Sequence, residues 1–304
     1  MSSEKKRGAE RTQKAVRDED WSDDYKAENE YFIMRYADVL LMYAEAKIEL
    51  GVVNEDLDLI QKELTKEQKG LLQKEKEAMK IQFSRLIEYL DFLPINVISI
   101  DRIEADDTIA YIAHTLLDED VTILSADQDF LQLVDERITV WSPTKKKFYT
   151  PRMVMDDYGV PAHNFLMYKV LMGDKSDNIE GVKGLGPKKL PKIVPDLLTQ
   201  TTLDLDFILE HAGKGEEPMH KKISESEIQL RLNEELMDLK NPPISGELKL
   251  QIARLIEAPI NLLSRNDFIM MYSDDQLGNA IKAPDLWLRE HFIKLNTLAK
   301  QTHE

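Results

Sequence analysis

The sequence predicts an α/β protein with a mainly parallel sheet, followed by a largely helical region. Three short runs rich in β-branched residues, at 96–100, 121–125 and 138–141, are typical of buried strands. Stretches with helical apolar periodicity, at 103–117 and 130–134, separate these runs. Strands that alternate with helices indicate βαβ units, in which parallel strands lie side by side.

The residues before the first predicted strand favour helices. Residues 1–30 are charged and poor in aliphatic side chains, so we expect them to be flexible or weakly helical. Strong helix formers fill residues 31–50, and the glycine that follows is a natural helix stop. Residues 55–78 are rich in Glu, Lys and Leu and predict an exposed helix, and residues 79–90 continue with a 3.6-residue apolar period.

The residues after the third predicted strand predict more helices. Residues 151–158 and 163–172 each predict a helix, residues 181–189 form a glycine-rich segment, and residues 190–304 are mostly helical in pattern. We therefore expect three regions. They are an atypical helical N-terminal region at 1–78, an α/β core at 79–150 and a helical domain at 151–304.

Composition limits the class of protein. The chain has 304 residues, 42% of them hydrophobic, which is enough for a sizeable core. It has no cysteine, which excludes a disulfide scaffold, an iron–sulfur site and a cysteine nucleophile. The N-terminus has no apolar core, and charges interrupt residues 31–50, so we expect no signal peptide and no membrane span. A net charge of −16 argues against a general nucleic-acid coat, because phosphates are bound by Lys and Arg.

Acidic residues gather where the predicted strands end. One group opens the helix after the first strand, a second follows the second strand, and a third lies in the loop after residue 172. Carboxylates without nearby Cys or His suit hard cations such as Mg²⁺ or Mn²⁺, and a pair of such ions supports phosphodiester hydrolysis. The candidate ligands are Glu104, Asp106, Asp107, Asp127, Asp129, Asp174 and Asp177.

Each group also has a purely structural explanation. Acids at a helix start, such as Glu104, Asp106 and Asp107, interact favourably with the helix dipole. Asp127 and Asp129, like the later pair, are also common in turns. Three such groups in one chain, two of them at carboxyl ends of neighbouring strands, favour a metal site.

The glycine-rich segment predicts a second kind of site. Glycines at a tight turn bring backbone N–H groups to the surface, and lysines follow with no acid among residues 181–192. This combination suits a phosphate backbone. The candidate residues are Gly181, Lys183, Gly184, Gly186, Lys188, Lys189 and Lys192. A second basic patch, Lys145 to Lys147 with Arg152, is explained equally well by a solvated hairpin tip.

Four motifs in order resemble one family. They are Ile-Glu-Ala-Asp-Asp at 103–107, Ser-Ala-Asp-Gln-Asp-Phe at 125–130, Gly-Asp-Lys-Ser-Asp-Asn-Ile at 173–179 and Gly-Val-Lys-Gly-Leu-Gly-Pro-Lys at 181–188. Residues 75–304 resemble the flap endonuclease family, which includes the 5′→3′ exonuclease domains of bacterial DNA polymerase I and the phage ribonuclease H and flap nucleases. The phage branch is the more similar.

The resemblance implies a fold and roles for these residues. The fold is a PIN-like core, a mixed sheet with helices on both faces, followed by a helix–hairpin–helix element and a helical C-terminal domain. Glu104, Asp106 and Asp127 would hold a first metal ion with support from Asp107, and Asp129, Asp174 and Asp177 a second. Residues 181–189 would grip duplex backbone, where relatives can hold K⁺.

The resemblance also implies an activity. It is two-metal hydrolysis of phosphodiesters at flaps, nicks or RNA–DNA junctions, in DNA replication or repair. The expected cofactors are two Mg²⁺ or Mn²⁺ ions. The expected partners are branched or nicked DNA, RNA–DNA hybrid and replication proteins. We expect a cytoplasmic protein of a phage-infected bacterial cell.

The N-terminal quarter departs from the family pattern. Relatives begin with a strand that ends in a metal-binding Asp, and the sequence predicts no such strand before residue 79. This leaves two alternatives open, a truncated or chimeric relative that binds branched DNA with little catalysis, and one half of a split nuclease. A structural or partner-binding protein, based on the helices at 31–78, is a third.

Overall fold

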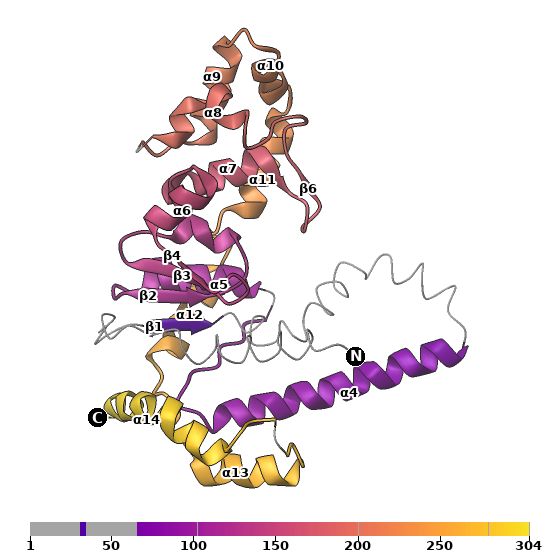
Figure 1. The fold of residues 1–304 in the computed structure, drawn as a ribbon, viewed down its shortest axis with the longest axis vertical. Helices are drawn as coiled ribbons and strands as arrows, with labels where there is room; N and C mark the ends of the chain where they lie inside the picture. Colours follow the sequence, from indigo (N-terminus) through magenta and orange to yellow (C-terminus); the bar gives the residue numbers. More distant parts are fainter. Residues whose placement is uncertain (1–30, 35–65, 102, 200, 279, 304) are drawn as a thin grey trace, which may run out of the picture.

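The computed structural model describes residues 31–34, 66–101, 103–199, 201–278 and 280–303. Its central feature is a four-stranded sheet in the order β1-β2-β3-β4 (Figure 1). β1 and β3 both run parallel to β2, and β4 is antiparallel to β3. This confirms the mixed, mainly parallel sheet. The strands are β1 (Tyr31–Met34), β2 (Val121–Leu124), β3 (Ile138–Ser142) and β4 (Lys147–Tyr149).

The pattern of burial explains why β2 and β3 were predictable. Val121, Thr122 and Ile123 are all fully buried, as expected for a central parallel strand covered on both faces. In β3, Ile138 and Val140 are buried while the residues between them are partly exposed. The fourth strand, β4, was not predicted, because it is only three residues long and follows the turn after β3 directly. It is recognised as a strand by its pairing with β3.

Two predicted elements differ from the structure. Residues 31–34, predicted as the start of a helix, form β1, and the rest of that predicted helix lies outside the described residues. Aromatic and β-branched residues favour a strand there, and pairing of Tyr31 with Val121 fixes the register. Residues 96–100, predicted as a strand, form none. β1 and β3 occupy both edges of β2, so Ile98 and Ile100 only pack against the core.

The helices follow the predicted order. α5 (Ala105–Tyr111) continues into a π-helical turn at Ile112–Leu116, and a short 3-10 helix, η2, spans Asp129–Leu133. α6 (Pro151–Tyr158) begins where the Thr150 hydroxyl accepts a hydrogen bond from the Met153 N–H and ends at Gly159, whose φ is 69°. The next are η3 (Ala162–Asn164), α7 (Phe165–Met172), α8 (Leu190–Ile193), η4 (Pro195–Leu198), α9 (Leu205–Lys214), α10 (Pro218–Glu225), α11 (Glu227–Met237), α12 (Gly246–Glu257), α13 (Arg265–Asp274) and α14 (Pro284–Gln301).

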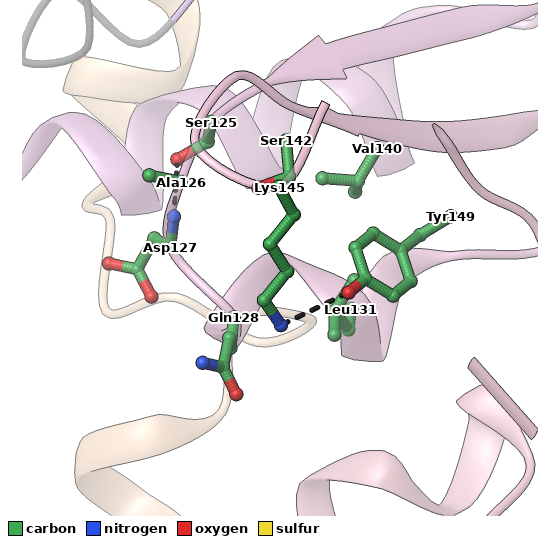
Figure 2. A pocket seen from close by; sticks show the side chains of 9 residues that line it. All are labelled: Ser125, Ala126, Asp127, Gln128, Leu131, Val140, Ser142, Lys145 and Tyr149. Carbon is green, nitrogen blue, oxygen red and sulfur yellow. Dashed lines mark hydrogen bonds between the residues drawn. The ribbon is translucent and has the colours of Figure 1, made fainter. Parts of the chain in front are cut away.

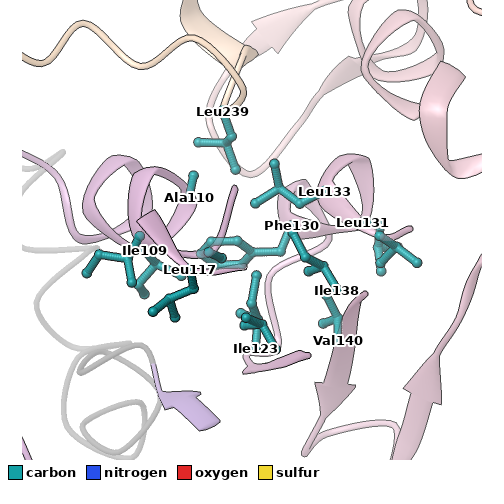
Figure 3. Close-up of a cluster of buried hydrophobic side chains, with 14 of the residues drawn as sticks. Ile109, Ala110, Leu117, Ile123, Phe130, Leu131, Leu133, Ile138, Val140 and Leu239 are labelled. Carbon is teal, nitrogen blue, oxygen red and sulfur yellow. The ribbon is translucent and has the colours of Figure 1, made fainter. Parts of the chain in front are cut away.

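The main core lies between the sheet and its helices. Phe130 is fully buried at its centre, surrounded by Ile109 from α5, Ile123 from β2 and Ile138 from β3 (Figure 3). Leu239, which follows α11, also enters this core. The polypeptide after α11 therefore returns to cover the α/β core. A second core joins α7 to the helices α8 to α11.

A third, smaller core joins α4 (Lys66–Asp91) to the C-terminal helices. Leu93 packs with Phe268, Tyr272 and Leu288, so this core connects the end of α4 to α13 and α14 (Figure 1). The predicted helices at 55–78 and 79–90 are one continuous helix from residue 66, and residues 55–65 lie outside the described part. In the described residues, no helix has both the length and the apolar character needed to cross a bilayer.

Candidate metal centre

Two glycines fix the loop that carries Asp174 and Asp177. Gly173 has a φ of 73° and follows α7 directly, and β5 (Gly173–Asp174) pairs with β6 (Ile179–Glu180). A Cβ on Gly173 would lie 2.3 Å from the Gly181 nitrogen, and a Cβ on Gly181 would lie 2.2 Å from the Met172 carbonyl carbon. Only glycine fits at either position, because the backbones of the two residues are in contact. This contact fixes the direction in which the loop leaves α7.

A tight turn after β2 places the second pair of acids. The Asp127 N–H donates to the Ser125 hydroxyl over 3.0 Å, and the Asp129 N–H donates to the Asp127 carboxylate over 3.0 Å. Asp129 then begins η2. The local hydrogen bonds suit the turn that was one explanation of these acids, but they also place Asp129 at the carboxyl end of β2, where sites form in open α/β sheets.

Three of the predicted ligands meet. Carboxylate oxygens of Asp129, Asp174 and Asp177 lie within 4.8 Å of one another. Asp129 and Asp174 are partly buried, and Asp177 is exposed. Oxygen atoms alone form this donor set, as expected for a hard divalent cation. The residues that the resemblance assigned to the second ion are therefore together in the structure, and they fit such an ion.

A lysine that was not predicted lies inside this cluster. The Lys169 ammonium group is 2.6 Å from the Asp129 carboxylate and donates a hydrogen bond to the Asp174 carboxylate. Its side chain is only 10% exposed. Lys169 is the single charged residue of α7, within the apolar run Phe-Leu-Met-Tyr-Lys-Val-Leu-Met, and this lone charge was the signal that could have found it.

The electrostatics of the cluster are uneven. Burial raises the pKa of Asp129 to about 6, although the neighbouring Lys169 opposes that change. Burial also raises the pKa of Asp174, but hydrogen bonds from Lys169 and Ser176 outweigh it and hold that pKa at about 2. One ammonium group therefore does not compensate the cluster, and its remaining negative charge suits a bound cation.

The other predicted ligands are not gathered with these three. Glu104 is the residue before α5 and is exposed, and Asp106 and Asp107 lie in the first turn. The Glu104 side chain makes no capping hydrogen bond, but all three acids lie at the helix start, where the helix dipole remains a structural explanation for them. Burial and the nearby Glu104 raise the pKa of Asp107. Within the described ranges, Asp129, Asp174 and Asp177 form the only such group of three, so the set for a first ion stays a prediction.

The glycine-rich segment forms a compact turn. Gly184 has a φ of 87°, and the Lys189 and Leu190 N–H groups both donate to the Gly186 carbonyl. The Lys189 ammonium group donates to the Gly184 carbonyl over 2.9 Å. Lys222 of α10, which was not predicted, donates to the Lys183 carbonyl over 3.3 Å. Two lysines therefore stabilise the turn. The side chains of the remaining candidates, Lys183, Lys188 and Lys192, are exposed.

The second basic patch belongs to the β3–β4 hairpin. Lys147 forms an ion pair of 2.6 Å with Asp157, and Arg152 lies 3.7 Å from Asp156. Lys145 donates hydrogen bonds to the hydroxyl groups of Tyr149 and Tyr158. These contacts within the protein favour the structural explanation of the patch.

Two family models match the chain. The N-terminal resolvase-like domain of 5′-3′ exonuclease matches residues 22–159, and the C-terminal SAM fold of 5′-3′ exonuclease matches residues 160–256. The first match includes residues 22–74, which lie before the region where the four motifs suggested the resemblance.

Two curated relatives carry the same designation, and a third is a DNA polymerase I. The chain is 36% identical over 117 residues to a 5′-3′ exonuclease of Aquifex aeolicus, which covers 38% of this chain and 40% of that protein. It is 29% identical over 205 residues to a 5′-3′ exonuclease of Buchnera aphidicola, covering 66% and 67%. It is 30% identical over 197 residues to DNA polymerase I of Caldicellulosiruptor bescii, covering 60% of this chain and 23% of that protein. The chain thus spans less than half the length of two of these relatives.

A solved structure shares the fold. The T5 5′-exonuclease with bound zinc ions superimposes with a TM-score of 0.52 at 19% identity, covering 82% of this chain and 99% of that one. The fold and the carboxylate cluster match the α/β fold of the PIN-type nucleases. The chain belongs to the 5′-3′ exonuclease family, which includes the flap endonucleases.

Proposed function

We propose that the chain is a divalent-metal-dependent 5′ nuclease that hydrolyses phosphodiesters as a 5′-3′ exonuclease or flap endonuclease. The observation that carries this proposal is the meeting of Asp129, Asp174 and Asp177 at the carboxyl end of a parallel strand. Family membership supports it, because two of the relatives above are designated 5′-3′ exonucleases.

The carboxylates would hold two ions, Mg²⁺ or Mn²⁺. Asp129, Asp174 and Asp177 would hold one, and Glu104, Asp106 and Asp127, supported by Asp107, would hold the other. When bound, such ions lower the pKa of water and offset charge on a phosphate. Asp129 must give up its proton to act as a ligand, and a pKa of about 6 allows this at neutral pH.

Lys169 has a defined part in this site. Its ammonium group contacts both Asp129 and Asp174, so a divalent ion competes with it for the same oxygens. With an ion bound, the lysine would keep its positive charge beside Asp129 and Asp174. That charge would offset part of the repulsion between a substrate phosphate and the carboxylates.

The substrate would be branched or nicked DNA, with RNA–DNA hybrid as a further substrate. The exposed lysines of the glycine turn, Lys183, Lys188 and Lys192, would contact duplex phosphates, and Gly181, Gly184 and Gly186 would let backbone N–H groups approach. Lys189 would act mainly by holding the turn. A K⁺ ion at this turn, replication proteins as partners and a cytoplasmic location in an infected bacterial cell are further parts of the proposal.

Cleavage of a 5′-flap substrate tests the proposal. We expect Mg²⁺-dependent cleavage by the purified chain and a loss of at least ~100-fold when both Asp127 and Asp129 are changed to Ala. Asp118→Ala is the matched control, because Asp118 is an exposed acid outside the cluster. Equal cleavage by the wild type and the double variant would refute the assignment.

One observation favours a second candidate, a relative that binds branched DNA with little catalysis. The described residues gather only three of the seven predicted carboxylates in one group. Tight flap binding together with no cleavage above that of the double variant would support this candidate. Turnover that exceeds the double variant's by ~100-fold would exclude it.

A further inference from the structure

A hydrogen-bonded network leads from the β3–β4 hairpin to Gln128, the residue before Asp129 of the candidate metal centre. The Lys145 ammonium group donates to the Tyr149 hydroxyl over 3.0 Å and to the Tyr158 hydroxyl over 3.1 Å. The Tyr149 hydroxyl donates a hydrogen bond to the Asp157 carboxylate over 3.1 Å, and the Tyr158 hydroxyl donates one to the Gln128 side-chain oxygen over 2.8 Å. Lys145 is therefore the common donor of two branches, of which one ends at Gln128.

This network fixes which end of the Gln128 amide faces outward. An ammonium group has only donors, so each tyrosine hydroxyl accepts from Lys145 and must give its hydrogen to an acceptor. Tyr158 therefore requires the amide oxygen of Gln128, and the NH₂ group points elsewhere. Phe165, 5.0 Å from the Tyr158 ring between ring centroids, holds that ring in place.

Gln128 stands between two candidate ligands. It lies between Asp127 and Asp129 in the turn after β2, and its side chain is exposed. In Figure 2 the Asp127 carboxylate and the Gln128 amide both extend away from Val140, and both residues line a small pocket together with Lys145. Among the described residues, none accepts a hydrogen bond from the Gln128 NH₂ group.

We propose that the Gln128 NH₂ group binds a phosphate oxygen of the nucleic-acid strand at the metal centre, and that Tyr158 and Lys145 are positioning residues that aim it. This inference rests on the proposed function. An NH₂ group carries no charge, so it can stand beside Asp127 and Asp129 without competing with a metal ion for their oxygens. It is also a donor only, as a phosphate oxygen requires.

A phosphate is favoured over a base edge by the surroundings. A strand that enters a group of carboxylates meets repulsion at each phosphate, and a fixed donor offsets it at low entropic cost. Contacts to phosphates fix where the nucleic-acid strand lies on the protein, and they carry no sequence information. The turn also holds Gln128 close to the ligands in the sequence, so the phosphate it contacts would be the cleaved one or an adjacent one.

The experiment compares variants on substrates with one neutral phosphate. Each phosphate around the cleavage site of a 5′-flap DNA is replaced in turn by a methylphosphonate, and kcat and KM are measured for the wild type, Gln128→Ala, Tyr158→Phe and Tyr149→Phe. Tyr149→Phe is the matched control, because it removes a hydroxyl bonded to the same Lys145 atom but on the branch that ends at Asp157. Thermal unfolding of each variant separates folding defects from the effect sought.

We expect Gln128→Ala to lower kcat/KM by roughly tenfold and Tyr158→Phe by a smaller factor, with Tyr149→Phe near the wild type. One methylphosphonate should slow the wild type by roughly tenfold and have little further effect on Gln128→Ala, because both changes remove the same contact. Additive losses at every position, or equal losses in the two tyrosine variants, would overturn the proposal.

Binding of unmodified flap DNA in Ca²⁺ gives a readout that does not need turnover. If the wild type binds flap DNA in Ca²⁺ but does not cleave it in Mg²⁺, the proposed function fails. The contact between Gln128 and a phosphate is then tested by the binding measurements alone. Weaker binding by Gln128→Ala, with the same methylphosphonate having no further effect, would then support the contact. Equal affinity of the wild type and Gln128→Ala would refute it.

Discussion

The ammonium group of Lys169 lies 2.6 Å from the carboxylate of Asp129, among the three acids that suit a divalent ion. Both side chains are largely buried, so neither charge is well solvated. In the metal-free protein the lysine therefore stabilises the cluster, and in the metal-bound protein it competes for the same oxygens. The two roles predict opposite effects of one substitution.

Lys169→Met should destabilise the metal-free protein and strengthen metal binding. Loss of the buried partner leaves Asp129 and Asp174 without compensation, which should cost roughly 3 kcal/mol of the free energy of unfolding. Mn²⁺ should bind about tenfold more tightly, because the competing charge is gone. Urea unfolding in EDTA and Mn²⁺ titration measure the two effects. Lys300→Met, an exposed lysine on α14, is the control, and weaker Mn²⁺ binding by Lys169→Met would contradict the prediction.

Asp129→Asn should separate stability from metal binding in the other direction. The pKa of Asp129 is raised from 3.8 to about 6, so its charged form, which predominates at pH 7, costs the folded protein stability relative to the unfolded chain. The amide removes that charge and should stabilise the metal-free protein by on the order of 1–3 kcal/mol at pH 7, while Mn²⁺ binding is lost. A metal-free Asp129→Asn protein that is less stable than the wild type at pH 7 would show that the Lys169 contact outweighs burial.

The same carboxyl group should give the metal-free wild type a pH-dependent stability. Between pH 4 and pH 6 the folded state keeps a proton on Asp129 that the unfolded state has released. The stabilisation from this proton is complete below about pH 4 and is lost as the pH rises through about 6. Asp174 acts oppositely, but only at pH values between its ordinary range and about 2. The free energy of unfolding, measured from pH 4.5 to 7, should change less with pH in Asp129→Asn than in the wild type.

Gly181→Ala should disrupt the loop that carries Asp174 and Asp177. A Cβ there would lie 2.2 Å from one backbone carbon and 2.5 Å from the Gly173 nitrogen, so the backbone must move. We expect a loss of about 3 kcal/mol in stability and weaker Mn²⁺ binding. Gly213→Ala is the control, because a Cβ there has nothing within 4 Å and favours helix α9. Equal stability of the two variants would refute the close approach of the two strands.

The lysines of the glycine turn should divide into two kinds. Lys188→Ala should weaken DNA binding and lower the slope of log affinity against log salt by about 0.9, with no change in thermal stability. Lys189→Ala should lower the slope as well as the thermal stability, because Lys189 also holds the Gly184 carbonyl. Fluorescence anisotropy between 50 and 200 mM salt checks this, and a Lys188→Ala slope equal to that of the wild type would remove Lys188 from the interface.

Local signals made part of the fold predictable. Thr150, Pro151 and Gly159 mark the two ends of α6 within a few residues of each other, so the sequence predicted that helix with its observed bounds. The run at 121–125 is β-branched and apolar, and β2 lies there. Residues close in the sequence determine these two elements, so local sequence patterns are enough to predict them.

Elements that depend on distant residues were not predictable. β1 exists because Tyr31 pairs with Val121, ninety positions later in the chain, and the strong helix formers that follow residue 34 in the sequence outweighed the local preference for a strand. Asp129, Asp174 and Asp177 were predictable as candidates because acids after strand ends suit cations. Lys169 was not, because its two partners are placed by different elements and its helical run reads as apolar core.

Arg85 and Asp275 are in contact in the folded protein but are made at very different times during synthesis. Arg85 of α4 forms an ion pair of 2.8 Å with Asp275, at the end of α13, and Tyr89 donates to the same carboxylate. The two residues of the ion pair are 190 positions apart. At a synthesis rate of about 5–20 residues per second, α4 leaves the ribosome roughly 10–40 s before its partner exists. During that interval Phe268, Tyr272 and Leu288, which pack against Leu93 in the described part of the fold, have not been made, so a chaperone that shields the end of α4 should raise the yield of folded protein.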